Sequence, residues 1–239
     1  MKGGCFLKEK IRAAVAAVLL TGLIILCWQM SVKLKGTIEE GKATSGIADG
    51  TAAVIILDPG HGGKDPGKIG VNGVEEKEIN LNIALKIQNI LLKKGISVSM
   101  TRTTDERLAV SLVEDLRERV EMINESGPRL AVSIHQNSYS DEGIQGAQVF
   151  YFKDSKDGEK AAECIQNALA KLDPENAKQI KANNTYYLLK NTEVPVVIAE
   201  CGFLSNYEEA EKLTTEVYQE EIAQAIAEGI EEYAGTSSE

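Results

Sequence analysis

Short apolar runs alternate with longer amphipathic stretches along the chain from about residue 52 onward. The apolar runs are rich in β-branched or aromatic residues, which favours strands. These runs span residues 53–57, 96–102, 129–134, 146–152 and 195–199. Between and after them, apolar side chains recur every three or four residues, which is typical of helices packed on one face. Repeated strand–helix order predicts a single α/β domain at residues 52–236, with a twisted, mostly parallel sheet flanked by helices on both faces.

The N-terminal segment has a different pattern. A basic flank at residues 1–12 precedes an apolar stretch without charge at residues 13–30. A stretch of this length is at the lower limit for crossing a bilayer, so we expect a transmembrane signal anchor, with a cleaved signal peptide as the alternative. Residues 31–51 are polar and lack apolar periodicity, which predicts a linker. The basic flank predicts a cytoplasmic N-terminus and an extracytoplasmic domain anchored in the cell envelope.

Charge narrows the range of partners. The formal net charge of the whole chain is −10. Residues 1–35 carry six basic residues and one acidic residue. The remaining residues therefore include 20 basic and 35 acidic side chains, with a net charge of −15. An acidic domain is a poor ligand for nucleic acid, so we expect no nucleic-acid partner. Within the domain the cysteines are Cys164 and Cys201, which is too few for a disulfide scaffold.

The candidate chemistry follows three of the predicted strands. The chain has two histidines, and His61 and His135 each come directly after an apolar run. Glu200 ends a third run in the same way. The carboxyl ends of parallel strands meet at one edge of a sheet, so we expect these three side chains to lie together.

Two imidazoles and one carboxylate are typical of a catalytic zinc site, which has three protein ligands and one position open for water. His61 and His135 would supply the imidazoles. Glu76 follows His61 across a glycine-rich loop and begins a predicted helix, which makes it a candidate third ligand. Glu75 and Glu78 are neighbours that the spacing does not exclude. Glu200 would then act as general base toward the attacking water.

Other interpretations of these residues stay open. Cys201 and His135 together would suit a thiol nucleophile, although a cysteine with apolar neighbours is usually inert. Strand alternation predicts that Cys201 points away from Glu200. Arg102 and Arg119 are candidates for binding substrate, but we expect surface ion pairs for both.

Four motifs, in this order, resemble those of the zinc-dependent N-acetylmuramoyl-L-alanine amidases. They are Asp58–Gly67 (DPGHGGKDPG), Glu76-Lys77, Ser133–Asn137 (SIHQN) and Glu200–Asn206 (ECGFLSN). The resemblance covers about residues 53–234. It implies His61, Glu76 and His135 as Zn²⁺ ligands and Glu200 as the catalytic glutamate. It favours Glu76 over its neighbours because a lysine follows the ligand in that family.

The resemblance implies hydrolysis of the amide between N-acetylmuramic acid and L-alanine in peptidoglycan. A short anchored form is similar to the sporulation or germination-specific amidases that form muramic lactam in spore cortex. The expected partners are peptidoglycan strands with their stem peptides and the membrane, with a protein activator left open. The alternatives are a Cys-His cell-wall peptidase that uses Cys201 and a catalytically silent wall-binding module.

Overall fold

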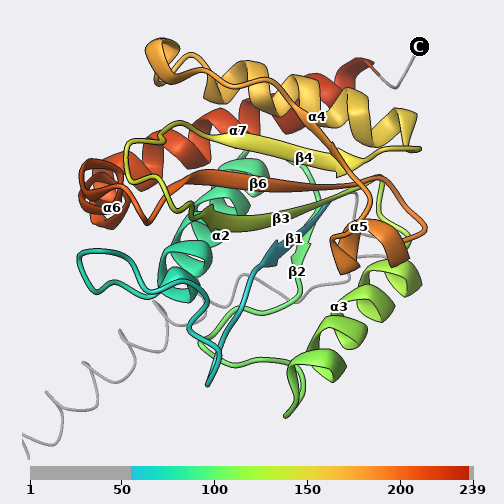
Figure 1. Ribbon diagram of the computed structural model, residues 1–239. Coiled ribbons are helices and arrows are strands. Elements are labelled where there is room, and N and C mark those ends of the chain that lie inside the picture. Colours follow the sequence, from blue (N-terminus) through green and yellow to red (C-terminus); the bar gives the residue numbers. More distant parts are fainter. Residues whose placement is uncertain (1–54, 237–239) are drawn as a thin grey trace, which may run out of the picture. The chain divides into compact units, whose positions relative to one another are not determined.

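The computed structural model describes residues 55–236, which form a six-stranded sheet covered by helices (Figure 1). The predicted flank, anchor and linker at residues 1–12, 13–30 and 31–51 lie outside the described residues, so they stay predictions. Within residues 55–236, none of the helices combines the length and apolar character that a membrane crossing requires.

The sheet has the strand order β2-β1-β3-β6-β4-β5. The strands are β1 (Ile55–Pro59), β2 (Val98–Met100), β3 (Leu130–Asn137), β4 (Gln148–Phe152), β5 (Lys181–Asn183) and β6 (Val196–Phe203). Neighbouring strands pair in parallel except at β4, which runs antiparallel to β6. The predicted mostly parallel α/β sheet is therefore confirmed, with one reversed pairing near an edge.

Helices cover both faces of the sheet. They are α2 (Glu76–Lys93), α3 (Leu112–Ser126), α4 (Lys156–Leu169), α5 (Tyr187–Asn191), α6 (Tyr207–Thr214) and α7 (Glu216–Thr236), with a short 3₁₀ turn at Pro174–Asn176. Helices α2, α4 and α7 bury the larger apolar layer, whereas α3 and α5 bury a smaller one on the opposite face (Figure 1). The central strands β1, β3 and β6 are therefore covered by apolar side chains of helices on both faces.

Two strands extend further than their apolar runs. β3 includes His135 and β6 includes Glu200, so both side chains lie within strands rather than just after them. The register pairs His135 with Glu200, and it shifts before Asn137 pairs with Phe203. Paired residues on neighbouring strands point to the same face, so His135 and Glu200 share one face at the carboxyl-terminal edge of the sheet.

Candidate metal centre

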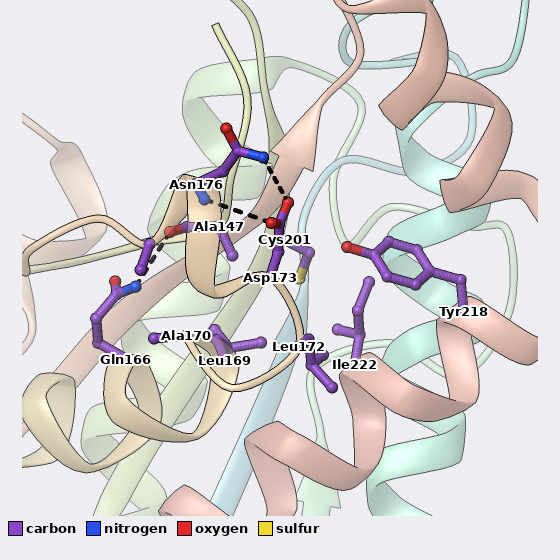
Figure 2. Close-up of a pocket in the computed structure, with 11 residues that line it drawn as sticks. Ala147, Gln166, Leu169, Ala170, Leu172, Asp173, Asn176, Cys201, Tyr218 and Ile222 are labelled. Carbon is purple, nitrogen blue, oxygen red and sulfur yellow. Dashed lines mark hydrogen bonds between the residues drawn. The ribbon is translucent and has the colours of Figure 1, made fainter.

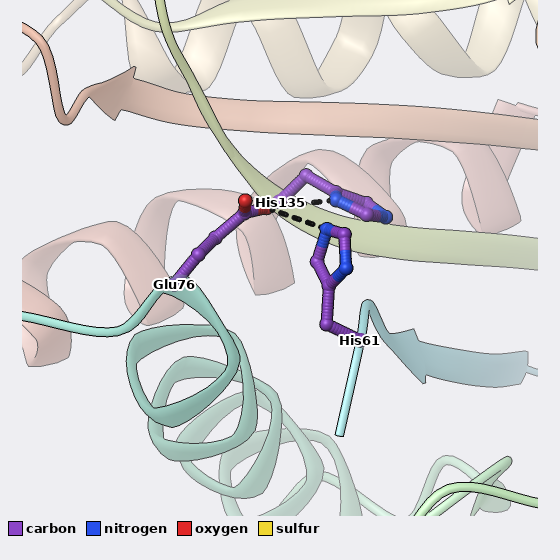
Figure 3. Close-up of side chains that lie close together, drawn as sticks. All are labelled: His61, Glu76 and His135. Atoms are coloured by element: carbon purple, nitrogen blue, oxygen red, sulfur yellow. Dashed lines mark hydrogen bonds and ion pairs between the residues drawn. The ribbon is translucent and has the colours of Figure 1, made fainter. Parts of the chain in front are cut away.

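Three segments that are distant in sequence meet at this edge of the sheet. His61 lies in the loop after β1, Glu76 is the first residue of α2, and His135 lies near the end of β3 (Figure 3). Each offers one potential ligand atom, and these atoms all lie within 4.8 Å of one another. The structure therefore brings together three of the four site residues expected from the sequence.

Glu76 is the centre of this cluster. Its Oε1 lies 2.9 Å from Nδ1 of His135 and 3.4 Å from Nε2 of His61. Its Oε2 accepts a hydrogen bond from the Lys68 backbone N–H at 2.8 Å, and the Gln136 N–H donates to Oε1 at 3.1 Å. Burial alone would raise the pKa of Glu76, but its hydrogen bonds to the two histidines outweigh burial and hold that pKa far below its usual range.

The neighbouring acids do not join the cluster. The Glu75 carboxylate pairs with Lys77 at 3.2 Å, and Glu78 is exposed to solvent. Of the three carboxylates that the spacing left open, Glu76 is the one that the structure places beside the histidines.

His61 is fixed by a carboxylate on its outer side. Its Nδ1 lies 2.9 Å from Oδ2 of Asp65, so its Nε2 faces Glu76. Burial lowers the pKa of His61, but hydrogen bonds to Glu76 and Asp65 outweigh burial and raise that pKa to about 9. A carboxylate behind a histidine fixes the tautomer and the ring orientation of a metal ligand.

Two glycines make room for the imidazoles. A Cβ on Gly60 would lie 2.2 Å from Cε1 of His135, and a Cβ on Gly67 would lie 2.6 Å from Oε2 of Glu76 and 2.7 Å from Cδ2 of His61. A side chain at either position would overlap these groups, so the close approach of the backbone requires glycine there.

Glu200 lies beside the cluster, in register with His135 on the next strand. Its side chain is buried, and its Oε2 accepts no hydrogen bond from any residue in the described range 55–236. Burial is the main reason that its pKa is raised, to about 7, with His135 opposing the shift. A buried carboxylate oxygen without a donor is available to take a proton from a molecule in the site.

Cys201 is on the opposite face of the sheet, as strand alternation predicts. It is completely buried and lines a cavity of about 10 Å³ together with Tyr218 and Ile222 (Figure 2). Burial raises the pKa of its thiol well above the usual range. Cys164 is also a free thiol, so the two cysteines of the domain do not pair.

The expectation of surface ion pairs for Arg102 and Arg119 is wrong. Both side chains are buried, and both donate hydrogen bonds to backbone carbonyls of the loop that carries His61. Sequence reasoning missed this role because burial of an arginine depends on tertiary neighbours. It also missed Asp65, although its i, i+4 spacing from His61 within the first motif was an available signal.

The donor set fits a zinc ion. Zinc accepts imidazole nitrogen and carboxylate oxygen at about 2 Å each, so its ligand atoms lie roughly 3–4 Å apart. The distances of 2.9 and 3.4 Å from Glu76 Oε1 to the two imidazole nitrogens agree with this geometry. Three protein ligands would also leave one position open, as in catalytic zinc sites.

Comparison with known proteins identifies the family. Residues 55–232 match the family model described as N-acetylmuramoyl-L-alanine amidase. The chain belongs to this amidase family. The germination-specific N-acetylmuramoyl-L-alanine amidase of Bacillus subtilis (strain 168) is 37% identical over 188 residues, which cover 75% of this chain and 79% of that relative. The amidase AmiA of Escherichia coli (strain K12) is 30% identical, over 95% of this chain and 91% of AmiA.

Solved amidase structures share the fold. The CwlD amidase from Clostridioides difficile, in complex with the GerS lipoprotein, superposes with a TM-score of 0.73 and 40% identity. That alignment covers 76% of this chain and 98% of the CwlD chain. The catalytic domain of CwlV from Bacillus (Paenibacillus) polymyxa var. colistinus gives a TM-score of 0.69 at 31% identity, over 76% of this chain and 97% of CwlV.

Proposed function

We propose that this amidase is zinc-dependent, with His61, Glu76 and His135 as the Zn²⁺ ligands and Glu200 as the general base. The reaction is hydrolysis of the amide that joins the lactyl group of N-acetylmuramic acid to L-alanine in peptidoglycan. The observation that supports the proposal most strongly is the convergence of two imidazoles and one carboxylate within 4.8 Å, beside a buried carboxylate in strand register with His135.

The residues have separate roles in this reaction. When bound, zinc supplies a Lewis acid that polarises the scissile carbonyl and lowers the pKa of water. Glu200 takes a proton from the attacking water and delivers it to the leaving nitrogen as the C–N bond breaks. The products are the lactyl carboxylic acid on the glycan and the free amine of L-alanine. A pKa of about 7 suits Glu200 to both proton transfers near neutral pH.

The alternative Cys-His peptidase is disfavoured by the position of Cys201. A thiolate nucleophile requires partial exposure and a lowered pKa, whereas Cys201 is buried and the pKa of its thiol is raised. A silent wall-binding module is also disfavoured, because a module without catalysis has no need for a buried Glu200 oxygen that lacks a hydrogen-bond donor.

The experiment that tests this function is mass spectrometry of muropeptides after digestion of peptidoglycan with the full-length chain. We expect stem peptides that begin with a free L-alanine amine, together with glycan that retains its lactyl carboxyl group. A chelator should abolish their release, and added Zn²⁺ should restore it. Cleavage inside the stem peptide, or release that resists chelation, would contradict the proposal.

We further propose that the protein acts outside the cytoplasmic membrane, held by the anchor predicted at residues 13–30, in spore cortex maturation. Similarity to the germination-specific amidase of Bacillus subtilis supports the cortex role. The complex of CwlD with GerS supports a protein partner for this chain as well. The muramic-lactam content of spores that lack the gene tests the cortex role, and normal lactam content would contradict it.

A further inference from the structure

Two buried guanidinium groups lie against the loop that carries His61. Arg102 follows β2, and Arg119 is in the middle of α3, yet both side chains donate to backbone carbonyls within residues 59–61 and share the carbonyl of Pro59. Buried charges are costly unless they are paired or fully hydrogen-bonded, so the partners of these two groups indicate what they hold in place.

Arg119 binds the loop while two carboxylates compensate its charge. Its Nε donates to Asp115 Oδ2 at 2.7 Å, and its Nη1 donates to Asp58 Oδ1 at 2.7 Å. The same Nη1 donates to the carbonyl of Pro59 at 2.8 Å, and Nη2 donates to the carbonyl of His61 at 2.7 Å. The guanidinium therefore connects α3 and β1 to the backbone of the candidate ligand itself.

Within residues 55–236, the Arg102 guanidinium donates its hydrogen bonds to backbone carbonyl oxygens. Its Nε donates to the carbonyl of Pro59 at 2.9 Å, and its Nη2 donates to the carbonyls of Gly60 and Lys77, both at 2.9 Å. Its Nη1 donates to the carbonyl of Thr104 at 3.0 Å. Lys77 follows Glu76 in the first turn of α2, so one guanidinium joins the His61 loop to the helix start that carries Glu76.

The backbone conformation of His61 explains why these hydrogen bonds from Arg102 and Arg119 are useful. His61 has a φ of 63°, the one non-glycine residue with positive φ in the described part of the chain. This left-handed conformation is unfavourable for a residue with a side chain, and it persists only where surrounding contacts determine it. The successive carbonyls of Pro59, Gly60 and His61 all accept hydrogen bonds from Arg102 or Arg119.

We propose that Arg102 and Arg119 are positioning residues that hold His61 and Glu76 at the spacing required to bind zinc. This inference rests on the metal assignment made under the proposed function. Both arginines act through the backbone that carries the candidate ligands, and neither is itself a proposed ligand. Residues that orient metal ligands from outside typically contribute about 10- to 100-fold to metal affinity, which sets the size of the expected effect.

The test is zinc affinity, measured on the full-length chain by competition with a chromophoric chelator, for Arg102→Lys and Arg119→Lys. An ammonium keeps the charge but lacks the planar fork that reaches several carbonyls at once. We expect each variant to bind zinc about tenfold or more weakly than the wild type. Amidase turnover should recover at saturating zinc, because the defect is in the position of the ligands and not in Glu200.

Gln166→Leu is the matched control for lost buried hydrogen bonds. Gln166 is buried on the α4 side of the sheet, where its side chain accepts from the Val149 N–H and donates to the carbonyl of Ala147. This variant should lower the melting temperature and leave zinc affinity within about twofold of the wild type. Arginine variants with a lowered melting temperature and wild-type zinc affinity would overturn the proposal and show a purely structural role.

Asp115→Asn provides a milder change if the arginine variants fail to fold. It leaves both guanidinium groups in place and weakens the contact of Asp115 with Arg119, while an amide oxygen can still accept the hydrogen bond from the Leu108 N–H. Zinc affinity should fall in the same direction, and unchanged affinity would overturn the proposal. His61→Ala separates the two claims. If this variant binds zinc as tightly as the wild type, the metal assignment fails. If zinc affinity is unchanged in the arginine variants alone, only the positioning role of Arg102 and Arg119 is overturned.

Discussion

Glu200 and Cys201 are adjacent on β6 and have opposite chemical environments. Glu200 shares a face with His135, while Cys201 packs in the larger apolar layer. Burial raises the pKa of both groups. For a carboxylate this change brings the pKa closer to neutrality, which suits a general base, whereas for a thiol it suppresses the reactive thiolate.

Cys201→Ala should therefore leave amidase turnover within about twofold of the wild type, because the thiol lies on the far face from the histidines. The cost is confined to packing, at about 1–2 kcal/mol of unfolding free energy for a small buried truncation. Turnover by muropeptide release and unfolding by denaturant titration check the two statements. Complete loss of turnover in a folded variant would revive the thiol mechanism.

At the residue scale, the sequence was sufficient to predict that the two histidines lie together. His61 and His135 are the chain's histidines, and each follows or ends an apolar run, so the parallel topology brings them together. The choice of Glu76 over Glu75 and Glu78 needed either the family motif or the structure. The carbonyl contacts of Arg102 and Arg119 were not predictable, because they depend on how the loop after β1 turns.

At the element scale, the Asp58 carboxylate connects β1 to three other segments near the loop that carries His61. Its carboxylate accepts hydrogen bonds at 2.7 Å from Thr101 after β2, Ser133 in β3 and Arg119 in α3. Burial raises the pKa of Asp58, but the charge of Arg119 and the hydroxyl hydrogen bonds outweigh burial and lower that pKa below its usual value. The carboxylate is therefore stabilised in its ionised form by the folded protein.

Asp58→Asn should destabilise the domain by about 3–5 kcal/mol at neutral pH, because it removes one carboxylate partner from buried Arg119. A depressed folded-state pKa adds stability above the unfolded pKa of about 4, and that stability is lost as the pH falls below it. The gap between wild type and variant should therefore narrow below about pH 4. Denaturant unfolding across this pH range measures the gap.

Glu231→Gln is the control for this prediction. Glu231 pairs with Lys94 on the surface at 2.8 Å, and exposed pairs contribute about 0–1 kcal/mol. An Asp58→Asn variant that is no less stable than this control would show that the buried network does not stabilise the fold.

Periodicity was sufficient to predict the main strands of the sheet and the helices that cover it, but not the residues at which they end. The apolar runs marked β1, β3 and β6, whereas β3 continues past its run to Asn137 and β6 continues past Glu200 to Phe203. β5 was missed because Lys181–Asn183 is short and has no apolar pattern. The reversal of β4 was missed because an apolar run alone does not encode its direction.

At the scale of the whole molecule, the acidic domain and the predicted anchor suggest how the enzyme reaches its substrate. We expect the full chain in the membrane fraction of cells, since residues 13–30 are uncharged and follow a basic flank. Fractionation with N-terminal sequencing checks this prediction. A soluble mature chain that begins after Met30 would show that the segment is a cleaved signal.

The most direct test of the central claim is Glu200→Gln, with zinc content, thermal unfolding and muropeptide release measured on one preparation. Glutamine keeps the size of the side chain but removes its basic oxygen, and loss of a general base typically costs about 10²- to 10⁴-fold in rate. We expect zinc content and a melting temperature close to those of the wild type, with almost no release of peptides that begin with L-alanine. Near wild-type release would remove Glu200 from the mechanism, and loss of zinc would make it a ligand instead of the base.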